Sequence, residues 1–245
     1  MPDAAIATDK LRRPSVVEAV CEFRFAHGIS YTVIPGMMRE RLRSKFPTFE
    51  VLPTATLMAG IPDEVLLPQI PHHRFKSQQP NALVQTGPRL LTVNVLPVYP
   101  GFDVFRALIL EVQHHYSEVA EAGNPVKVSL RYINLIQSSS AEADLSRHLK
   151  ISFSYPGELP KPAQEIAARL VLSYGDLGTL GFAIAFPSRI ATGEVGALLD
   201  LEFSWNEPRV FDLSHFPEWL EGAHQVIFKA FTSTVAENIM AEMRG

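Results

Sequence analysis

Hydrophobic and polar positions alternate along residues 17–25. Apolar side chains occupy every second position, charged side chains stand between them, and only Val20 breaks the alternation. A period of two residues is typical of a β-strand that buries one of its faces. We therefore predict a strand here, whose buried face is formed by Val17, Ala19, Cys21, Phe23 and Phe25.

The spacing of apolar residues then becomes helical. Apolar side chains recur every four residues over 33–46, which predicts an amphipathic helix that Pro47 ends. From Phe102 to Val119 they recur every three or four residues, which predicts a long helix. The elements predicted between these helices are a strand at 49–58, an irregular proline-rich passage at 61–71, and an antiparallel meander at 74–79, 82–86 and 90–96.

The same order of elements begins again after the turn Gly123-Asn124-Pro125. The pattern predicts a strand at 126–137, a short helix around 144–149, a hairpin of strands at 166–173 and 180–186, a strand at 197–205, and one unbroken helix over 216–243. Glycines 175 and 178 supply the turn of the hairpin.

These patterns predict an α+β fold of two similar sequential halves in one compact unit. Residues 1–13 form a disordered or flexible N-terminus, 14–123 the first half and 124–245 the second. Each half is a strand, a helix, several antiparallel strands and a long helix. Such halves bury one face of a sheet under their helices, and two of them can join their sheets side by side. The expected architecture is a TBP-like or helix-grip pair.

The composition is that of a globular protein. Hydrophobic residues make up 47% of the 245 positions and charged residues 20%, unlike the composition of disordered chains. The formal net charge of −4 argues against a protein that holds nucleic acid mainly through phosphates. No stretch approaches the ~20 apolar residues that cross a bilayer. Residues 1–13 also lack the apolar core of a secretory signal, so we expect a cytoplasmic protein without membrane contact.

Cys21 is the single cysteine of the chain. One thiol forms no internal disulfide and builds no zinc site of several thiolates. Because it lies in an apolar run without nearby cues for an activated thiolate, we predict that Cys21 is a small core residue.

Four segments carry a resemblance that spans nearly the whole chain. They are PSVVEAVCEFRF at 14–25, LVQTGPRLLTVN at 83–94, YPGF at 99–102 and LRYIN at 130–134. As an ordered set they resemble a sporadically distributed bacterial family of uncharacterised proteins. The resemblance implies no assigned activity, cofactor or catalytic residues. The patchy distribution of the family indicates genes that move between genomes, as in defence or mobile-element loci.

Two copies of Glu-x-x-His, Glu111 to His114 and Glu221 to His224, fall on the long helices of the two halves. In di-iron carboxylate proteins this spacing puts both ligands on one helical face. Here His114 falls away from the apolar stripe of its helix, whereas His224 falls on its stripe. Since a shared metal needs both histidines to face inward, we expect no metal or other cofactor, and a partly buried, hydrogen-bonded His224.

Polar residues inside the predicted strands are the more informative candidates. A polar group at an inward position needs a partner within the protein or a ligand. Glu18 and Glu22 share one strand face, and each can pair with Arg131 if the first strands of the two halves are neighbours. Three readings stay open, namely exposed ion pairs, structural hydrogen bonds and a ligand-binding patch. The candidate patch residues are Glu18, Glu22, Arg24, Gln85, Asn94, Arg131 and Asn134, with His224 added from the last helix.

No Gly-x-Ser-x-Gly elbow or phosphate-binding glycine loop occurs in the chain. The leading hypothesis is therefore a non-catalytic binding or regulatory module for a protein or small-molecule partner, with a homo-oligomer left open. The alternative is an enzyme of unfamiliar type, such as a hydrolase acting on nucleotides or nucleic acid, with Glu18, Arg131 or His224 as working groups. A third hypothesis is DNA binding through a saddle-shaped sheet.

Overall fold

The computed structural model describes residues 11–26, 28–57, 70–137, 145–159, 163–189, 195–205 and 210–245. Within these ranges the protein is α+β, with nine strands in one antiparallel sheet and five α-helices. The strands are β1 Val16–Phe25, β2 Thr48–Val51, β3 His73–Gln78, β4 Asn81–Gly87, β5 Leu90–Val95, β6 Pro125–Ile136, β7 Ile166–Ser173, β8 Thr179–Arg189 and β9 Val195–Trp205. The helices are α1 Ile34–Leu42, α2 Pro53–Leu57, α3 Phe102–Ala120, α4 Phe216–Thr234 and α5 Glu237–Arg244. Short 3-10 turns are η1 Leu145–Arg147, η2 Gly175–Leu177 and η3 Leu213–His215.

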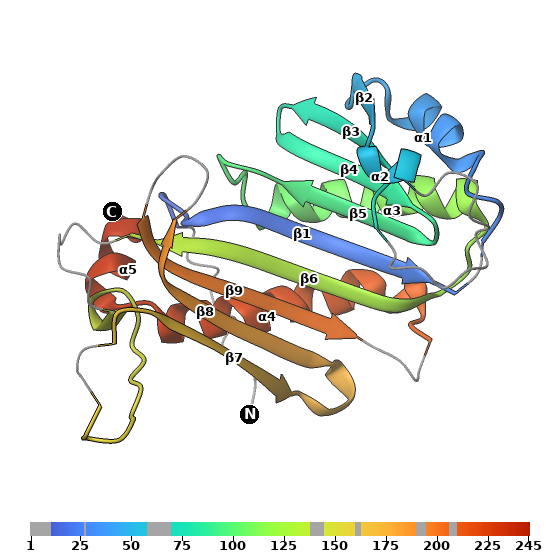
Figure 1. Cartoon of the computed structure of the whole chain (residues 1–245). Coiled ribbons are helices and arrows are strands. Elements are labelled where there is room, and N and C mark those ends of the chain that lie inside the picture. The colour runs from blue at the N-terminus through green and yellow to red at the C-terminus, as the bar shows by residue number, and fades with distance from the viewer. Residues whose placement is uncertain are drawn as a thin grey trace, which may run out of the picture.

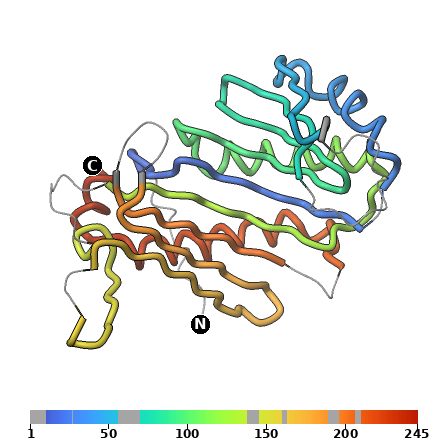
Figure 2. Tube along the Cα trace, viewed as in Figure 1, coloured from blue at the N-terminus to red at the C-terminus, as the bar shows by residue number. Residues whose placement is uncertain are grey.

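The strands run in the order β2-β3-β4-β5-β1-β6-β9-β8-β7 across the sheet. The first strand of each predicted half, β1 or β6, lies at the centre, where the two pair antiparallel with Val20 opposite Arg131. The chain colours separate the first half, blue to green, from the second, yellow to red, on either side of this pair (Figure 2). The sheets of the two halves are therefore joined into one.

The long helices cover one face of the sheet and leave the other face open (Figure 1). α3 packs on β5, α4 packs on β9 and β6, and α1 packs on α3. The apolar side chains of β1 point into this layer, where Phe23 meets Phe216 at a ring distance of 5.0 Å and Phe25 stacks on Tyr116 at 5.2 Å. Cys21 is fully buried there, which confirms its predicted core position.

The predicted meander and hairpin are confirmed. β3, β4 and β5 pair in sequence, and β7 pairs with β8 along its whole length. Gly178 ends the turn between β7 and β8 with φ of 136°. A Cβ added at Gly178 would lie 2.5 Å from the carbonyl oxygen of Ser204, so only glycine fits this turn without rearrangement.

Three predicted elements are shorter than the pattern indicated. The helix expected at 33–46 is α1 Ile34–Leu42, which ends before Pro47. The strand expected at 49–58 ends at Val51, because Pro53 begins α2. Proline has a fixed φ and no N–H, so it favours the first turn of a helix over a continuing strand. The short helix expected at 144–149 is the 3-10 turn Leu145–Arg147 in the described part of the chain. The second half therefore has no described counterpart of α1.

The prediction of one unbroken C-terminal helix over 216–243 is wrong. α4 ends at Thr234 and α5 begins at Glu237, with Val235 and Ala236 extended between them. The extended pair forms a β-bridge with the segment that follows η1. Val235 pairs with Leu149, and the N–H of Ala236 donates to the carbonyl of His148 at 3.0 Å. Apolar spacing continues through the break, so periodicity alone could not reveal it.

Residues 11–13 lie against the C-terminal helix. The backbone N–H groups of Arg12 and Arg13 donate to the carbonyl of Met243 at 2.8 and 3.2 Å.

Residues 1–10 of the predicted N-terminus, and most of the predicted irregular passage at 61–71, lie outside the described residues. Over the described parts of the chain, none of the helices combines the length and apolar character that crossing a membrane requires.

Candidate functional site

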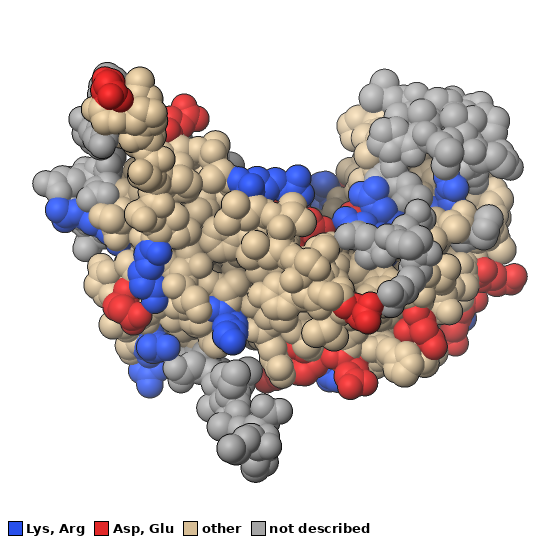
Figure 3. Space-filling model, turned by 90° about the horizontal axis from the view of Figure 1, so that it is seen from below, with Lys and Arg blue, Asp and Glu red and all other residues tan. Residues whose placement is uncertain are grey.

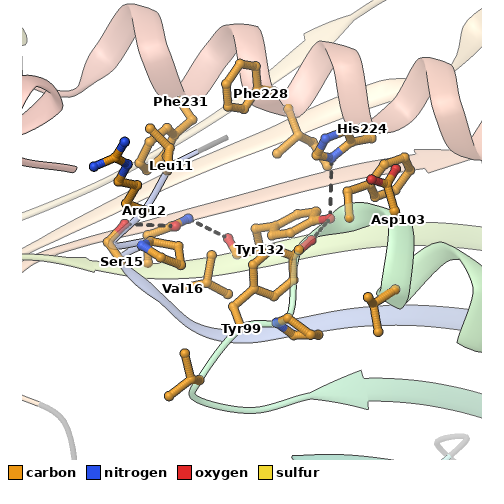
Figure 4. Close-up of a pocket in the computed structure, with 18 of the residues that line it drawn as sticks. Leu11, Arg12, Ser15, Val16, Tyr99, Asp103, Tyr132, His224, Phe228 and Phe231 are labelled. Atoms are coloured by element: carbon orange, nitrogen blue, oxygen red, sulfur yellow. Dashed lines mark hydrogen bonds between the residues drawn. The ribbon is translucent and has the colours of Figure 1, made fainter. Parts of the chain in front are cut away.

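A pocket of about 390 Å³ opens on the helix-covered side of the sheet. It is bounded by the segment that leads into β1, the start of α3, the strand β6 and one side of α4 (Figure 4). Its apolar walls include Leu11, Val16, Phe102, Ile227, Phe228 and Phe231. The pocket therefore lies where the two halves of the chain and the N-terminal segment meet.

The start of α3 is shaped by Gly101. Its φ of 93° lies in a region that side-chain-bearing residues rarely adopt, and it turns the chain from the loop after β5 into the helix. As a result Tyr99 and Phe102, on either side of this turn, both line the pocket. The turn thus delivers one hydroxyl group and one aromatic ring to the same cavity.

A chain of polar side chains crosses one end of the pocket. The hydroxyls of Tyr99 and Tyr132 lie 2.9 Å apart, and the Tyr132 hydroxyl lies 3.4 Å from Nδ1 of His224. Burial raises the pKa of both tyrosines. Both phenols therefore stay protonated near neutral pH, and they act as hydrogen-bond donors and acceptors without carrying charge.

His224 is held as a neutral ring. It is 9% exposed, and its imidazole stacks on Phe102 with ring centroids 3.7 Å apart. Burial lowers the pKa of His224 to about 4, an effect that the nearby carboxylate of Asp103 only partly opposes. At pH 7 the ring is therefore uncharged, with one nitrogen that donates and one that accepts.

The opposite end of the pocket is also polar. The Ser15 hydroxyl donates to Oδ1 of Asn134 at 3.2 Å, and the Asn134 amide donates to the carbonyl of Leu199 at 3.3 Å. Arg12 stands beside this end, and its guanidinium donates to the backbone carbonyl of Gly245 at 2.9 Å (Figure 4). The pocket therefore combines apolar walls with hydrogen-bonding groups at two separated ends, as ligand pockets commonly do, and the charged residues Arg12, Asp103 and Glu221 also line it.

The eight predicted site residues divide between the two faces of the sheet. Asn134 and His224 line the pocket on the helix-covered face. The other six lie on the open face, where the alternation of each strand points away from the helices. These are Glu18, Glu22, Arg24, Gln85, Asn94 and Arg131. The eight therefore do not form one site, because the sheet separates the two groups.

Basic side chains lie along the middle of the open face, which is seen in profile at the upper margin of Figure 3. β1 and β6 are neighbours, yet the hydrogen bonds of Arg131 run to β9, on the other side of β6. Its guanidinium donates to both carboxylate oxygens of Asp200, from Nε at 2.8 Å and from Nη2 at 2.5 Å. The hydrogen bond to Asp200 raises the pKa of Arg131 above its ordinary value. Glu18 acts on Arg131 only through its charge.

The remaining polar residues of this face also satisfy one another. Glu22 accepts from Nε of Arg24 at 2.7 Å and from Lys127 at 3.3 Å. Lys127 also donates to Glu202 at 3.1 Å. Burial acts to raise the pKa of Glu202, but the charge and hydrogen bond of Lys127, the hydrogen bond of Ser129 and the charge of Arg131 together lower it. These bonds link β1, β6 and β9, so they favour a structural role for the charged residues.

Neutral groups continue the network toward β3. The amide of Asn94 donates to Glu18 at 2.6 Å, and the hydroxyl of Thr92 donates to Asn94 at 2.8 Å. Gln85 donates to Thr92 at 3.3 Å and accepts from Nε of Arg74 at 3.2 Å. Thr92 and Asn94 are buried beneath the longer side chains. Buried polar groups are normally paired in this way. Thr92 and Asn94 are therefore satisfied within the protein and need no ligand.

The two Glu-x-x-His pairs do not converge. Glu111 binds Lys45, and Glu221 lies 3.7 Å from Arg106. The side chain of His114 is 69% exposed on α3, as its helical position predicted, whereas His224 lies in the pocket. Among the residues with described positions, no three side chains of metal-binding type gather closely enough to hold an ion.

Sequence reasoning overlooked three residues of the pocket, namely Tyr99, Phe102 and Tyr132. Each belongs to a segment that carried the resemblance, since Tyr99 and Phe102 lie in YPGF and Tyr132 lies in LRYIN. Ser15 and Val16, from the first of these segments, also line the cavity. Parts of three of these segments thus meet at the pocket. Membership in these segments was the sequence feature that could have identified the three residues.

A scan of the sequence against models of known protein families finds no match. A search of curated proteins finds no match either. The described part of the chain is an α+β protein with one nine-stranded sheet and a pocket under its helices. Because a fold alone does not determine a function, the residues of the pocket are the guide to what the protein does.

Proposed function

We propose that the protein is a non-catalytic binding module that holds a small, mostly apolar molecule in the pocket between α3, α4 and β6. The observation that carries this proposal is the pocket itself. Its volume of about 390 Å³ lies within the range of small-molecule sites. Apolar and aromatic side chains form its walls, and a few hydrogen-bonding groups lie at its ends. Such a site supplies apolar contact for affinity and polar groups for orientation.

The polar groups define the chemistry of the ligand. The hydroxyls of Tyr99 and Tyr132 and the ring of His224 are uncharged at neutral pH. They suit a neutral hydroxyl, carbonyl or amide group, because these three groups carry no charge to balance a buried ion. Arg12, Asp103 and Glu221 also line the pocket, but Arg12 donates to the carbonyl of Gly245 and Glu221 lies 3.7 Å from Arg106. We therefore expect a ligand with an apolar body and one such group directed at His224. A second polar group can reach Ser15 and Asn134 at the other end.

The enzyme alternative is less well supported. Its proposed working groups were Glu18, Arg131 and His224, and the sheet separates His224 from the other two. His224 is paired with Tyr132, which in turn is bonded to Tyr99, and its low pKa makes it a weak base at neutral pH. Of the three proposed working groups only His224 lies in the pocket, so binding remains the preferred function.

DNA binding by the sheet is the third candidate. The basic side chains of the open face are neutralised within the protein, as Arg131 is by Asp200 and Lys127 is by Glu22 and Glu202. Phosphate contacts need free cations, so this face favours a polar partner over a nucleic acid.

We also propose a cytoplasmic location, in a mobile-element or defence locus. The similarity of the two halves to a TBP-like or helix-grip pair remains part of the proposal.

The pocket can be tested with a probe and a matched pair of variants. N-phenyl-1-naphthylamine is a neutral, apolar dye whose fluorescence rises in apolar sites. Ser15→Phe adds a ring at the edge of the pocket, whereas Ser30→Phe makes the same change at an exposed position that does not line it. We expect the wild type and Ser30→Phe to bind the dye alike, and Ser15→Phe to bind it at least tenfold more weakly.

Native ligands can be sought by mass spectrometry of small molecules released from protein purified from its host. We expect a compound with the stated chemistry in the wild type and in Ser30→Phe, and its loss in Ser15→Phe. Equal dye binding by both variants, together with no captured compound, would overturn the proposal. Turnover of a captured compound would instead establish the enzyme alternative.

A further inference from the structure

β7 is the last strand at one edge of the sheet. β8 occupies one of its sides, with eight residue pairs from Ile166 opposite Phe186 to Ser173 opposite Thr179. The outer side of β7 faces away from the sheet (Figure 1). An edge strand presents a row of backbone donors and acceptors that a further strand can pair with.

The side chains of β7 are apolar and exposed. Leu170, Val171 and Leu172 are 55%, 62% and 43% exposed, and Leu177 in the following turn is 62% exposed. Arg169 is the one charged residue within the strand. A long, apolar edge with few charges is the kind of edge that associates with another chain.

The other edge strand differs on each of these points. β2 has four residues, and it carries the carboxylate of Glu50, which binds Lys76 at 2.5 Å and lies 3.9 Å from Arg74. Short length and charge are the usual protections of an edge. The contrast singles out β7 as the edge built for pairing.

We propose that β7 pairs antiparallel with β7 of a second copy of this chain. A two-fold axis perpendicular to the sheet would join the two nine-stranded sheets and place the helices of both copies on the same side. This symmetry pairs residues of the same strand face. An axis at Arg169 would set two guanidinium groups against each other. An axis at Leu170 avoids this, keeps most of the strand paired, and places Arg169 opposite the partner's Val171.

A second copy fits the size of the exposed patch. The exposed apolar side chains of β7 and its turn form a patch of on the order of a few hundred Å² in each copy, less than the ~800 Å² per partner of a standard interface. Backbone hydrogen bonds along the paired strands add to this contact. We therefore expect a reversible dimer whose population depends on concentration.

A cysteine cross-link tests the register. The native Cys21 is buried, so an introduced thiol on β7 is the one that reacts. Leu170→Cys places two thiols opposite each other across the axis, whereas Arg169→Cys places each thiol opposite the partner's Val171. Under mild oxidation we expect a disulfide dimer of Leu170→Cys and little of Arg169→Cys. Equal cross-linking of both variants would contradict the register.

Light scattering after size exclusion tests the dimer itself. Leu170→Lys places two like charges at the axis, and Val51→Lys makes a similar change on the opposite edge at a residue 60% exposed. We expect wild type and Val51→Lys to dimerise alike, and Leu170→Lys to raise the dimer dissociation constant at least tenfold. A wild type that stays monomeric at every concentration would overturn the proposal, and so would a dimer that survives Leu170→Lys.

Discussion

The imidazole of His224 lies flat on the ring of Phe102, with centroids 3.7 Å apart and planes 7° apart. The two residues come from opposite halves of the chain, because Phe102 begins α3 and His224 lies in the middle of α4. This contact joins the two long helices at the pocket. It also encloses the imidazole, which is why burial disfavours its charged form.

His224 should make the stability of the protein depend on pH. Its pKa is about 4 in the folded protein, against an ordinary value of 6.5. Between these values the unfolded chain binds a proton that the folded chain does not, so the free energy of unfolding falls as the pH falls from 6.5 toward 4. The contribution reaches up to about 3 kcal/mol. Urea unfolding monitored by circular dichroism at several pH values measures it.

The control for this prediction is His224→Phe, which keeps a ring on Phe102 and cannot titrate. Carboxylates also titrate at the acid end, so the informative quantity is the difference between the two stability profiles. We expect the variant to lose less stability than the wild type between pH 6.5 and 4. Parallel profiles would show that His224 titrates alike in both states.

The hydroxyl of Tyr132 should be worth more to stability than that of another buried tyrosine. It bridges Tyr99 and His224, so Tyr132→Phe leaves two buried groups short of a partner, at a cost of about 1–3 kcal/mol. Tyr116 is equally buried, but the pKa of its hydroxyl is raised by burial alone, without the hydrogen-bond effect that Tyr132 shows. We expect Tyr116→Phe to change the free energy of unfolding by less than half as much. Similar losses in both variants would argue against the bridge.

The sequence predicted the sheet well because its strands alternate cleanly. The pattern of β1 indicated which of its faces is buried, and the turns of the meander and hairpin indicated which consecutive strands are neighbours. The break in the C-terminal helix escaped prediction, because apolar spacing persists through Val235 and Ala236. The cause is a backbone bridge to Leu149, which lies far away in the sequence. A contact of this kind leaves no periodic signal.

The candidate site was only partly predictable. His224 was predicted to be inward and hydrogen-bonded, and it lies in the pocket. The polar strand residues were found because charges inside strands are conspicuous, but local pattern could not assign their partners. Asp200, which holds Arg131, comes from a strand whose neighbour is set by the topology of the whole sheet. Tyr99 and Tyr132 were missed because buried tyrosines resemble core residues in sequence.

Arg131 should couple more strongly to Asp200 than to Glu22. Its guanidinium makes a two-pronged contact with Asp200 and none with Glu22, whose partners are Arg24 and Lys127. Alanine double-mutant cycles in chemical unfolding measure both couplings. The contact is half-exposed, so we expect a coupling of about 1 kcal/mol for Arg131 and Asp200. A value as large for Arg131 and Glu22 would show that the whole network acts as one unit.

Proline should be resisted at Ala236, the last residue of the extended link between α4 and α5, and tolerated at Glu237, the first residue of α5. Ala236 has φ of −61°, which suits proline, but its N–H donates to the carbonyl of His148 at 3.0 Å. Glu237 is the first residue of α5, where proline is favoured.

Both prolines restrict the unfolded chain to a similar degree, so the comparison isolates the hydrogen bond. Glu237 also pairs with Lys150, but its side chain is 77% exposed and the pair contributes little. We therefore expect Ala236→Pro to be less stable than Glu237→Pro by about 1 kcal/mol in urea unfolding. If both variants were equally stable, the hydrogen bond from Ala236 to His148 would contribute nothing to stability. The break between α4 and α5 would then have to follow from the local sequence alone.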